Sequence, residues 1–460
     1  MTDEKIMSTI KPDGEYWQPE LETMPREQLQ QLQVKKLKES INVALKSPFY
    51  KKRLGEAGIT ADSINTIDDV RKSPFTTKQD LRDNYPYGLV GGNLDDAVRI
   101  HSTSGTTGNP CVVVYSEHDI CSWANMIARN LYMVGCRKSD VFQNSSGYGM
   151  FTGGLGFQYG AEWLGAMTVP AAAGNSKRQI KFIRDFGTTA LHAIPSYAIR
   201  LAEVFKEEGV DPATTKLRTL CIGAEPHTEE QRRRIENMLG VKAYNSFGMT
   251  EMNGPGVAFE CKYQQGMHLW EDNYIVEIVD PDTLEPVPDG EMGEMVLTTL
   301  DRNMMPILRY RTRDLTRIIA EPCKCGRTHR RIDRIKGRTD DMFIIKGVNV
   351  FPTHWPTTFL SAWAATACIS LTLSLRSSKP TVSISTMLFT ATAGKKAKRR
   401  TLSTARWTRK LTRNLCASSA KPKRRNRARS KSANFLKAAC QSKKWRVVAT
   451  KLSATGPCAR

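Results

Sequence analysis

A run of hydroxyl side chains and glycines, closed by a proline, occupies residues 102–110. The segments before and after it, 97–100 and 112–115, are rich in β-branched residues and are predicted to be strands. Because glycine lets the main chain approach a ligand closely, such a loop can turn N–H groups and hydroxyls toward one anion. It is not a Walker loop, since no Gly-Lys-Ser/Thr follows at the required spacing. The loop is therefore either a triphosphate site of another class or a solvated turn.

Three further polar motifs follow along the chain. Residues 244–251 combine aromatic residues, a glycine, a hydroxyl and a carboxylate, residues 310–314 are Tyr-Arg-Thr-Arg-Asp, and residues 337–352 begin with Gly-Arg-Thr-Asp-Asp. The hydroxyl of Thr250 can contact an α-phosphate, and the carboxylate of Glu251 is a hard oxygen ligand that suits Mg²⁺. Alternatively, the carboxylate of Glu251 interacts favourably with the positive N-terminal end of a helix dipole and binds no metal.

In this order the four motifs resemble the adenylate-forming superfamily of acyl-CoA synthetases and luciferases, and more finely the phenylacetate–CoA ligase family. The resemblance covers roughly residues 15–353 and includes Phe75-Thr76-Thr77-Lys78, residues 147–154, Gly223-Ala224-Glu225-Pro226 and Asn349-Val350-Phe351-Pro352. It implies an ATP-dependent, AMP-forming acid–thiol ligase of phenylacetate catabolism. Such an enzyme activates phenylacetate or a related aryl acid as an acyl-adenylate with Mg²⁺, and then transfers the acyl group to CoA.

The resemblance also implies roles for single residues. Thr250, Glu251 and Arg338 are expected at the catalytic centre, with Mg²⁺ on Glu251. Asp314 is expected to accept hydrogen bonds from the ribose, and a salt bridge to Arg311 or to Arg313 is the alternative. The full set of expected nucleotide-binding residues is Ser102, Ser104, Gly105, Thr106, Thr107, Gly108, Gly223, Ala224, Glu225, Pro226, Tyr244, Asn245, Asp314 and Arg338.

An acid-binding pocket is expected around residues 148–154. Aromatic walls on a glycine platform suit a flat ring, although such aromatic residues can equally belong to the core. The expected pocket residues are Tyr148, Phe151, Gly153 and Gly154. Lys346 is a candidate contact for phosphate or CoA, or else an exposed charge.

Two short segments carry possible metal ligands. Cys323 and Cys325 form a Cys-x-Cys pair, and Cys261 and His268 are seven positions apart. Three thiolates and an imidazole can make a closed, structural zinc site. The alternative is a set of unpaired buried thiols.

The pattern of apolar residues predicts an α/β fold. From residue 97 onward β-branched runs alternate with helical patterns, which indicates layers with mostly parallel strands, and residues 274–320 are predicted to form a small β subdomain. Helices are predicted at 26–56, 119–134, 177–185, 196–209 and 229–239. The expected large adenylate-forming domain covers 1–337, and a hinge with the start of the C-terminal domain covers 338–353.

Charge separates the last quarter of the chain from the rest. The net charge is +22, and residues 355–460 contain 24 of the 68 Lys and Arg residues but no Asp or Glu. Ordinary domains carry both signs. Residues 354–460 are therefore either a basic arm that binds nucleic acid or other polyanions, or a disordered product of a lost reading frame. We favour the second, in which the family's small α+β C-terminal domain is absent or not formed.

The basic-arm alternative would make the chain a catalytically dead ligase-fold protein. The family brings a C-terminal lysine, in a Gly-Lys context, onto the α-phosphate. Gly394-Lys395-Lys396 comes too soon after Pro352 to match it, so we do not assign that role to Lys395 and expect the C-terminus to impair activity.

Length and composition narrow the class of protein. A chain of 460 residues suggests two or three domains, and no apolar run of about 18 residues predicts a membrane span. No signal peptide is visible, and the 11 scattered cysteines indicate reduced thiols in a cytoplasmic protein. Small-molecule partners are expected, and a homodimer is left open.

Overall fold

The computed structural model describes residues 3–103, 109–341, 343–345, 348–350, 372–374 and 381–383. It divides into two units, Met1–His354 and Trp355–Arg460. In the second unit, β18 (Thr372–Ser374) and β19 (Thr381–Ser383) form an antiparallel pair. The predictions for residues 104–108, for Lys346 and for the rest of the acid-free tail lie outside the described residues. Everything below concerns the first unit.

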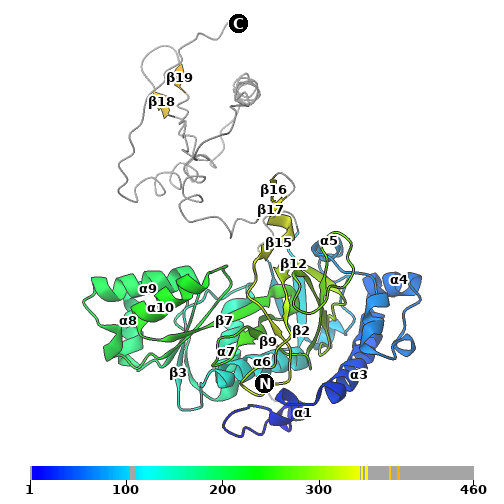
Figure 1. The fold of residues 1–460 in the computed structure, drawn as a ribbon, viewed down its shortest axis with the longest axis horizontal. Helices are drawn as coiled ribbons and strands as arrows, with labels where there is room; N and C mark the ends of the chain where they lie inside the picture. The colour runs from blue at the N-terminus through cyan, green and yellow to red at the C-terminus, as the bar shows by residue number, and fades with distance from the viewer. Residues whose placement is uncertain are drawn as a thin grey trace. The chain divides into compact units, whose positions relative to one another are not determined.

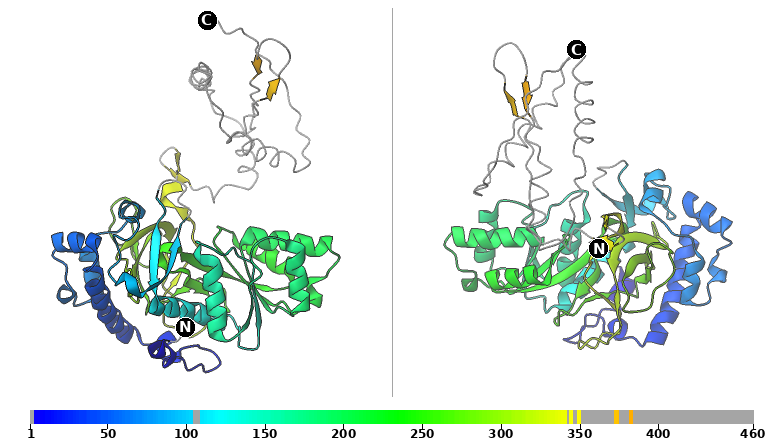
Figure 2. Two further views of the ribbon diagram at one scale, coloured as in Figure 1. Left: turned by 180° about the vertical axis from the view of Figure 1, so that it is seen from behind. Right: turned by 45° about the horizontal axis from the view of Figure 1, so that its top comes forward.

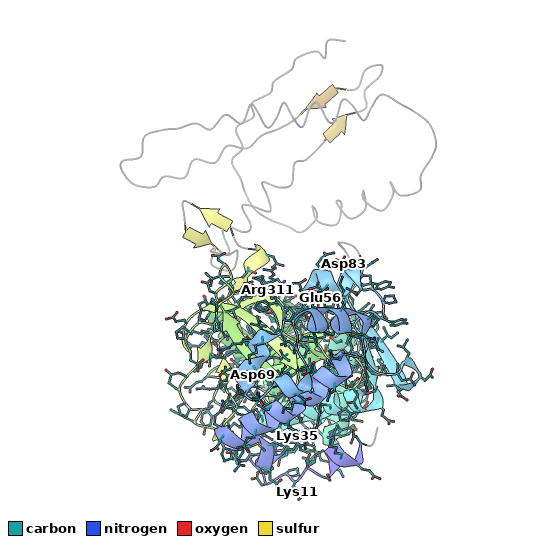
Figure 3. All side chains as sticks on the ribbon, turned by 90° about the vertical axis from the view of Figure 1, so that its right-hand side faces the viewer. Lys11, Lys35, Glu56, Asp69, Asp83 and Arg311 are labelled. Atoms are coloured by element: carbon teal, nitrogen blue, oxygen red, sulfur yellow. The ribbon has the colours of Figure 1, made fainter. Side chains whose placement is uncertain are left out.

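The N-terminal region is helical and lies at one end of the unit, opposite α8, α9 and α10 (Figure 1). Leu29, Leu37 and Ile41 give its longest helix a buried face. Charged residues such as Lys35 of this helix and Glu56 of the next lie at the surface (Figure 3). The predicted helix at 26–56 is confirmed as two helices. The bounds in this region are α1 (Glu4–Met7), α2 (Pro19–Glu22), α3 (Arg26–Ala44), α4 (Pro48–Glu56) and α5 (Lys78–Asp83).

The main sheet has nine strands in the order β13-β14-β9-β8-β7-β6-β5-β3-β4. Strands β3 to β7 pair in parallel, which confirms the α/β prediction, and antiparallel strands extend the sheet beyond β7. The bounds are β3 (Val141–Asn144), β4 (Met167–Val169), β5 (Ala190–Ala193), β6 (Thr219–Gly223), β7 (Lys242–Met249), β8 (Gly254–Glu260), β9 (Met267–Leu269), β13 (Ile318–Ile319) and β14 (Arg331–Ile332).

Five helices accompany the sheet, and α8, α9 and α10 gather at its parallel end (Figures 1 and 2). These three helices share a separate apolar cluster with strands β5 and β6, which includes Ile183, Leu201, Phe205, Leu220 and Ile235. Four of the five helices were predicted. The bounds are α6 (Glu117–Met133), α7 (Thr152–Leu164), α8 (Ser176–Asp185), α9 (Pro195–Glu207) and α10 (Glu229–Leu239).

Two smaller sheets flank the cleft described below. The hairpin of β1 (Ala97–Ser102) and β2 (Val112–Ser116) confirms the strands predicted on either side of the hydroxyl-rich loop. The predicted β subdomain is a four-stranded antiparallel sheet in the order β10-β11-β12-β15. Its strands are β10 (Tyr274–Val279), β11 (Gly293–Thr299), β12 (Tyr310–Thr316) and β15 (Gly337–Arg338), and a further pair, β16 (Phe343–Ile345) and β17 (Val348–Val350), follows.

Helix α7 was not predicted, and the reason lies in its glycines. The glycine-rich residues 153–156 were interpreted as the platform of an acid pocket that suits a flat ring, and glycine disfavours a helix interior by about 1 kcal/mol. In the structure they form the first turns of α7, which packs closely on α6. A Cβ at Gly156 would lie 2.4 Å from Trp123 Cζ2, and one at Gly160 would lie 2.1 Å from Ile127 Cγ2. Close packing of the two helices therefore outweighs the poor helix propensity.

This contact can be tested by adding a methyl group. We expect Gly160→Ala to lower the free energy of unfolding by about 1–3 kcal/mol, because the added Cβ overpacks the contact with Ile127. Gly153→Ala, in the same helix, is the matched control, since nothing lies within 4 Å of its Cβ position. Urea unfolding measures both variants, and equal losses of stability would contradict the packing argument.

Candidate active site

A cleft of about 730 Å³ opens beyond the carboxyl ends of β6 and β7. In open α/β sheets, ligands bind at this edge where the strand order changes, and β7 is the strand at which the sheet turns from parallel to antiparallel. The cleft brings together segments that are distant in the sequence: the start of α5, Thr103, residues 224–227, residues 245–251, β12 and residues 334–340.

All four motifs singled out in the sequence contribute residues to this cleft. The predicted residues that line it are Ala224, Glu225, Pro226, Asn245, Glu251, Asp314 and Arg338. Ser196 fixes Glu225, because its main-chain N and its Oγ donate to the two carboxylate oxygens at 3.0 and 2.9 Å. Gly223 permits close approach of β6 to β7, since a Cβ there would lie 2.3 Å from the carbonyl oxygen of Ser246.

Other predicted residues lie next to the cleft rather than in its lining. Ser102 and Tyr244 are buried within β1 and β7, and Thr250 begins a three-residue 3-10 turn, η5 (Thr250–Met252). Residues 104–108 fall outside the described part of the chain. Lys78, at the start of α5, and Arg82, in its last turn, line the same cleft as Thr103. Neither was assigned a role from the sequence, although Lys78 ends the Phe-Thr-Thr-Lys motif.

Glu251 is buried, and separate hydrogen bonds hold its carboxylate and its main-chain oxygen. Tyr310 Oη of β12 donates to Glu251 Oε1 at 3.1 Å, and Arg302 Nη1 donates to the main-chain oxygen of Glu251 at 2.9 Å. The η5 turn is only three residues long, so the helix-dipole explanation for this carboxylate has little support. A fixed carboxylate on the wall of the cleft fits an oxygen ligand for Mg²⁺.

Asp314 pairs with Arg338 across strands β12 and β15. Arg338 Nη1 donates to Asp314 Oδ1 at 3.1 Å, and Arg338 Nε donates to Asp340 Oδ1 at 2.8 Å. The two arginines considered as alternative partners of Asp314, Arg311 and Arg313, instead pair with Glu294 at 2.7 and 3.6 Å. Burial raises the pKa of Asp314 from its usual 3.8 to about 6, although Arg338 opposes the shift.

The raised pKa of Asp314 predicts a pH-dependent nucleoside affinity. Below about pH 6 the carboxyl is protonated, and the ribose hydroxyls that Asp314 is expected to bind would lose an acceptor, so the affinity for adenosine should fall as pH drops from 8 to 5. Adenosine has no phosphate that titrates in this range. Calorimetry should show weak, pH-independent binding for Asp314→Asn, and pH-independent binding by the unaltered protein would contradict the prediction.

The four predicted acid-pocket residues gather at the start of α7, outside the lining of the cleft. Tyr148 is half-buried, and its Oη accepts a hydrogen bond from Asn144 Nδ2 at 3.3 Å. Phe151 is 56% exposed at the N-cap of α7, which excludes a place in the core. A role of Tyr148, Phe151, Gly153 and Gly154 in binding the acid stays a prediction.

The four candidate metal ligands, although distant in the sequence, form one buried cluster. The ligand atoms of Cys261, His268, Cys323 and Cys325 all lie within 4.8 Å of one another. The Sγ atoms of Cys261 and Cys323 are 3.6 Å apart, and Cys325 Sγ is 3.3 Å from His268 Nε2. Tetrahedral zinc with ligands at about 2.0–2.3 Å needs separations of this size. His268 Nδ1 faces the carbonyl oxygen of His329 at 3.2 Å, which fixes the ring as outer-shell partners do.

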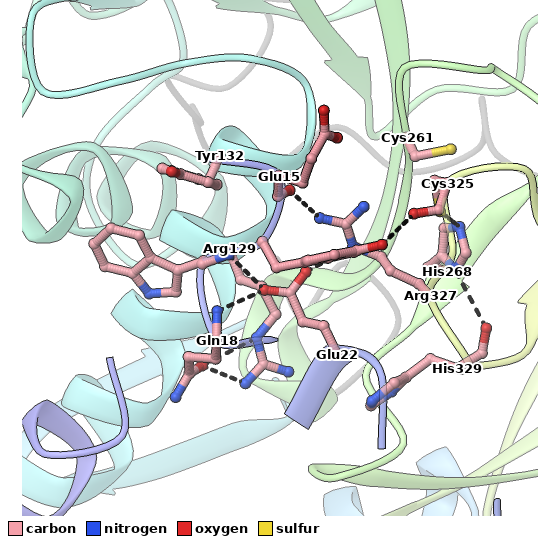
Figure 4. A network of polar contacts seen from close by, with 12 residues as sticks. Glu15, Gln18, Glu22, Arg129, Tyr132, Cys261, His268, Cys325, Arg327 and His329 are labelled. Atoms are coloured by element: carbon pink, nitrogen blue, oxygen red, sulfur yellow. Dashed lines mark hydrogen bonds and ion pairs between the residues drawn. The ribbon is translucent and has the colours of Figure 1, made fainter. Parts of the chain in front are cut away.

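Residues of the N-terminal segment 15–22 lie beside this cluster (Figure 4). Tyr16 Oη donates to the carbonyl oxygen of Cys325 at 2.8 Å. Arg327, two residues after Cys325, donates to Glu22 Oε2 at 2.6 Å and to the carbonyl oxygen of Glu15 at 3.1 Å. Glu22 Oε1 in turn accepts from the main-chain N of Gln18 at 2.8 Å. The conformation of the Cys-x-Cys loop is therefore coupled to the position of residues 15–22.

No helix among the described residues is both long and apolar enough to cross a membrane.

Comparisons with known proteins identify the family. The family model described as AMP-binding enzyme matches residues 37–306. The chain is 47% identical over 340 residues to a phenylacetate-coenzyme A ligase of Thermus thermophilus, which covers 74% of this chain and 76% of that one. It is 45% identical over 337 residues to a phenylacetate-coenzyme A ligase of Escherichia coli, covering 73% and 76%.

A solved structure has the same fold over this region. An open conformation of 2-hydroxyisobutyryl-CoA ligase, in complex with 2-HIB-AMP and CoA, superposes with a TM-score of 0.70 at 31% identity. The match covers 75% of this chain and 82% of that one. The cleft, the order of its motifs and these similarities lead to one conclusion: the chain belongs to the AMP-binding enzyme family and, within it, to the phenylacetate–CoA ligases.

Proposed function

We propose that this chain catalyses the ATP-dependent, AMP-forming ligation of phenylacetate, or a related aryl acid, to CoA. The observation that carries the proposal is the cleft, which gathers the motif residues of a chain 47% identical to a phenylacetate-coenzyme A ligase. A carboxylate oxygen of the acid attacks the α-phosphorus of ATP, and pyrophosphate leaves. The thiol of CoA then attacks the acyl carbon, and AMP leaves.

Different residues of the cleft bind different parts of the substrates in the first step, the adenylation of the acid. Residues 224–226 lie along the adenine, and Asp314 accepts hydrogen bonds from the ribose. Thr103 and the start of α5 lie on the phosphate side, where donors held in place stabilise the charge that develops on the phosphoryl oxygens. Glu251 would hold Mg²⁺, which neutralises phosphate charge when bound. Arg338 approaches the nucleotide from β15, and Thr250 contributes its hydroxyl from η5.

We also propose that the buried Cys/His cluster is a structural zinc site. Cys261, His268, Cys323 and Cys325 would hold the ion in a closed, four-ligand set without an open position for substrate. The supporting observation is the mutual approach of four ligand atoms from two segments that are distant in the sequence.

Several expectations remain predictions. They are the domain limits at 337 and 353, a cytoplasmic location, a homodimer, and the frameshifted tail with its impaired activity. The comparisons support the ligase function and give no support to the alternative, a catalytically dead protein whose basic tail binds polyanions.

The test of the proposed function is pyrophosphate release from ATP and Mg²⁺ with phenylacetate, followed by thioester formation when CoA is added. Aryl acids such as benzoate and phenylacetate should support release, and omission of the acid should abolish it. A protein that binds adenosine but releases no pyrophosphate with any aryl or arylacetic acid would overturn the proposal.

A further inference from the structure

Arg302 is a buried cation behind the cleft that the reaction described above does not use. It lies in the connection from β11 to β12, and 3% of its surface is exposed. Its Nη1 donates to the main-chain oxygen of Glu251 at 2.9 Å, and its guanidinium lies 5.4 Å from the ring centroid of Tyr115. Among the described residues, neither Nε nor Nη2 of Arg302 has a hydrogen-bond partner.

The connection that carries Arg302 is itself fixed. Asp119 accepts from the main-chain N of Asn303 at 2.7 Å and from that of Met304 at 3.2 Å. No ion pair within 4.0 Å joins Arg302 to a carboxylate in the described part of the chain. The buried carboxylate of Asp119 attracts the guanidinium from beyond ion-pair distance, so the fold holds a buried cation without a direct ion pair at one defined point. That point is directly behind the η5 turn.

Arg302 and Tyr310 hold two different groups of Glu251, the main-chain oxygen and the carboxylate. Tyr310 fixes the carboxylate from β12, whereas Arg302 fixes the main chain from the connection that leads into β12. Preorganised ligands lower the barrier because they need not reorient when charge develops. Without Arg302, the main-chain oxygen of Glu251 would lose the only side-chain hydrogen bond that it accepts among the described residues. Binding of the metal would then have to order the Glu251 carboxylate.

We propose that Arg302 is a positioning residue for adenylation, which orders the Glu251 turn and so presents the carboxylate to Mg²⁺. This inference rests on the proposed function, in which Glu251 is the metal ligand. Arg302 acts through Glu251 and contacts neither ATP nor the acid.

The experiment compares Arg302→Met and Arg302→Lys with Arg129→Met in the full chain. Arg129 is also buried, but it pairs with Asp272 at 2.8 Å and lines no part of the cleft, so its loss reports on stability alone. ATP binding is measured by calorimetry with and without Mg²⁺, and pyrophosphate release is measured over a range of Mg²⁺ concentrations with phenylacetate. Thermal unfolding is recorded for every variant.

For Arg302→Met we expect ATP affinity without Mg²⁺ to stay within about twofold of the unaltered protein. The Mg²⁺ concentration for half-maximal release should rise about tenfold, and kcat should fall about tenfold with little change in KM for phenylacetate. Arg302→Lys should have a Mg²⁺ midpoint and a kcat close to those of the unaltered protein. Arg129→Met should lower Tm without moving the Mg²⁺ midpoint.

An unchanged Mg²⁺ midpoint in Arg302→Met, with a fall in Tm like that of Arg129→Met, would overturn the inference. If Arg302→Met fails to fold, Arg302→Lys and Arg302→Gln decide the question by the same Mg²⁺ midpoint. If the unaltered protein itself releases no pyrophosphate, the proposed function fails, and the effect of Mg²⁺ on ATP binding still tests Arg302.

Discussion

Glu251→Gln should lower kcat for pyrophosphate release by about 10²–10³-fold, or about 3–4 kcal/mol in transition-state stabilisation. Glutamine has the same shape and can still accept the hydrogen bond from Tyr310, so the cleft should keep its structure. What is lost is the negative charge that Mg²⁺ prefers in an oxygen ligand. Stopped-time assays of pyrophosphate with saturating ATP, Mg²⁺ and phenylacetate measure the effect.

Two controls separate the metal role of Glu251 from loss of structure. Adenosine should bind to Glu251→Gln with unchanged affinity, because the ribose side of the cleft does not involve this carboxylate. Glu203→Gln alters an exposed glutamate of α9, paired with Arg200, and should leave kcat unchanged. A Glu251→Gln variant with kcat within twofold of the unaltered protein would exclude Glu251 as the metal ligand.

Combined Cys323→Ser and Cys325→Ser should remove about one zinc per chain and lower the free energy of unfolding by several kcal/mol. A structural metal binds only the folded chain, so its binding energy adds to stability. Metal analysis of the purified protein and thermal unfolding with and without a chelator measure both effects.

The matched control for the zinc prediction is Cys221→Ser, because Cys221 is a fully buried free thiol outside the cluster. It should lower stability without changing the metal content. Loss of the metal should also speed proteolysis within residues 15–22, since Tyr16 and Arg327 tie that segment to the Cys-x-Cys loop. Metal-free protein of undiminished stability would rule out the zinc site.

Elements with a clear apolar period were predicted from the sequence. Helices α6, α8, α9 and α10, the β1–β2 hairpin and the β subdomain all carry their own local pattern. Helix α7 was not predicted because Gly156 and Gly160 lower the helix propensity of the segment. The close packing of α7 on α6 explains why glycine stands at these two positions. Propensity is a local quantity, whereas helix packing depends on a partner elsewhere in the chain.

The sequence by itself determined the chemistry of this protein. The hydroxyl-rich loop at 102–110, the Glu251 motif, Asp314, Arg338 and the Cys and His residues are short local patterns, and their residue types limit what each can bind. Only the tertiary structure decided which of these groups meet. It gathered residues 224–226 and Asp314 in one cleft, gave Asp314 the partner Arg338 rather than Arg311, brought two distant segments into one Cys/His cluster, and buried Arg302 behind Glu251.

The physical reason is the range of the interactions involved. A turn that exposes N–H groups to an anion is set by its own residues, so its motif can be recognised in isolation. The partner of a buried guanidinium or thiol is set by strand order and by the packing of segments that are tens to hundreds of residues apart. Arg302 has no motif of its own, and its bond to Glu251 follows only from the way in which the β11–β12 connection passes behind η5.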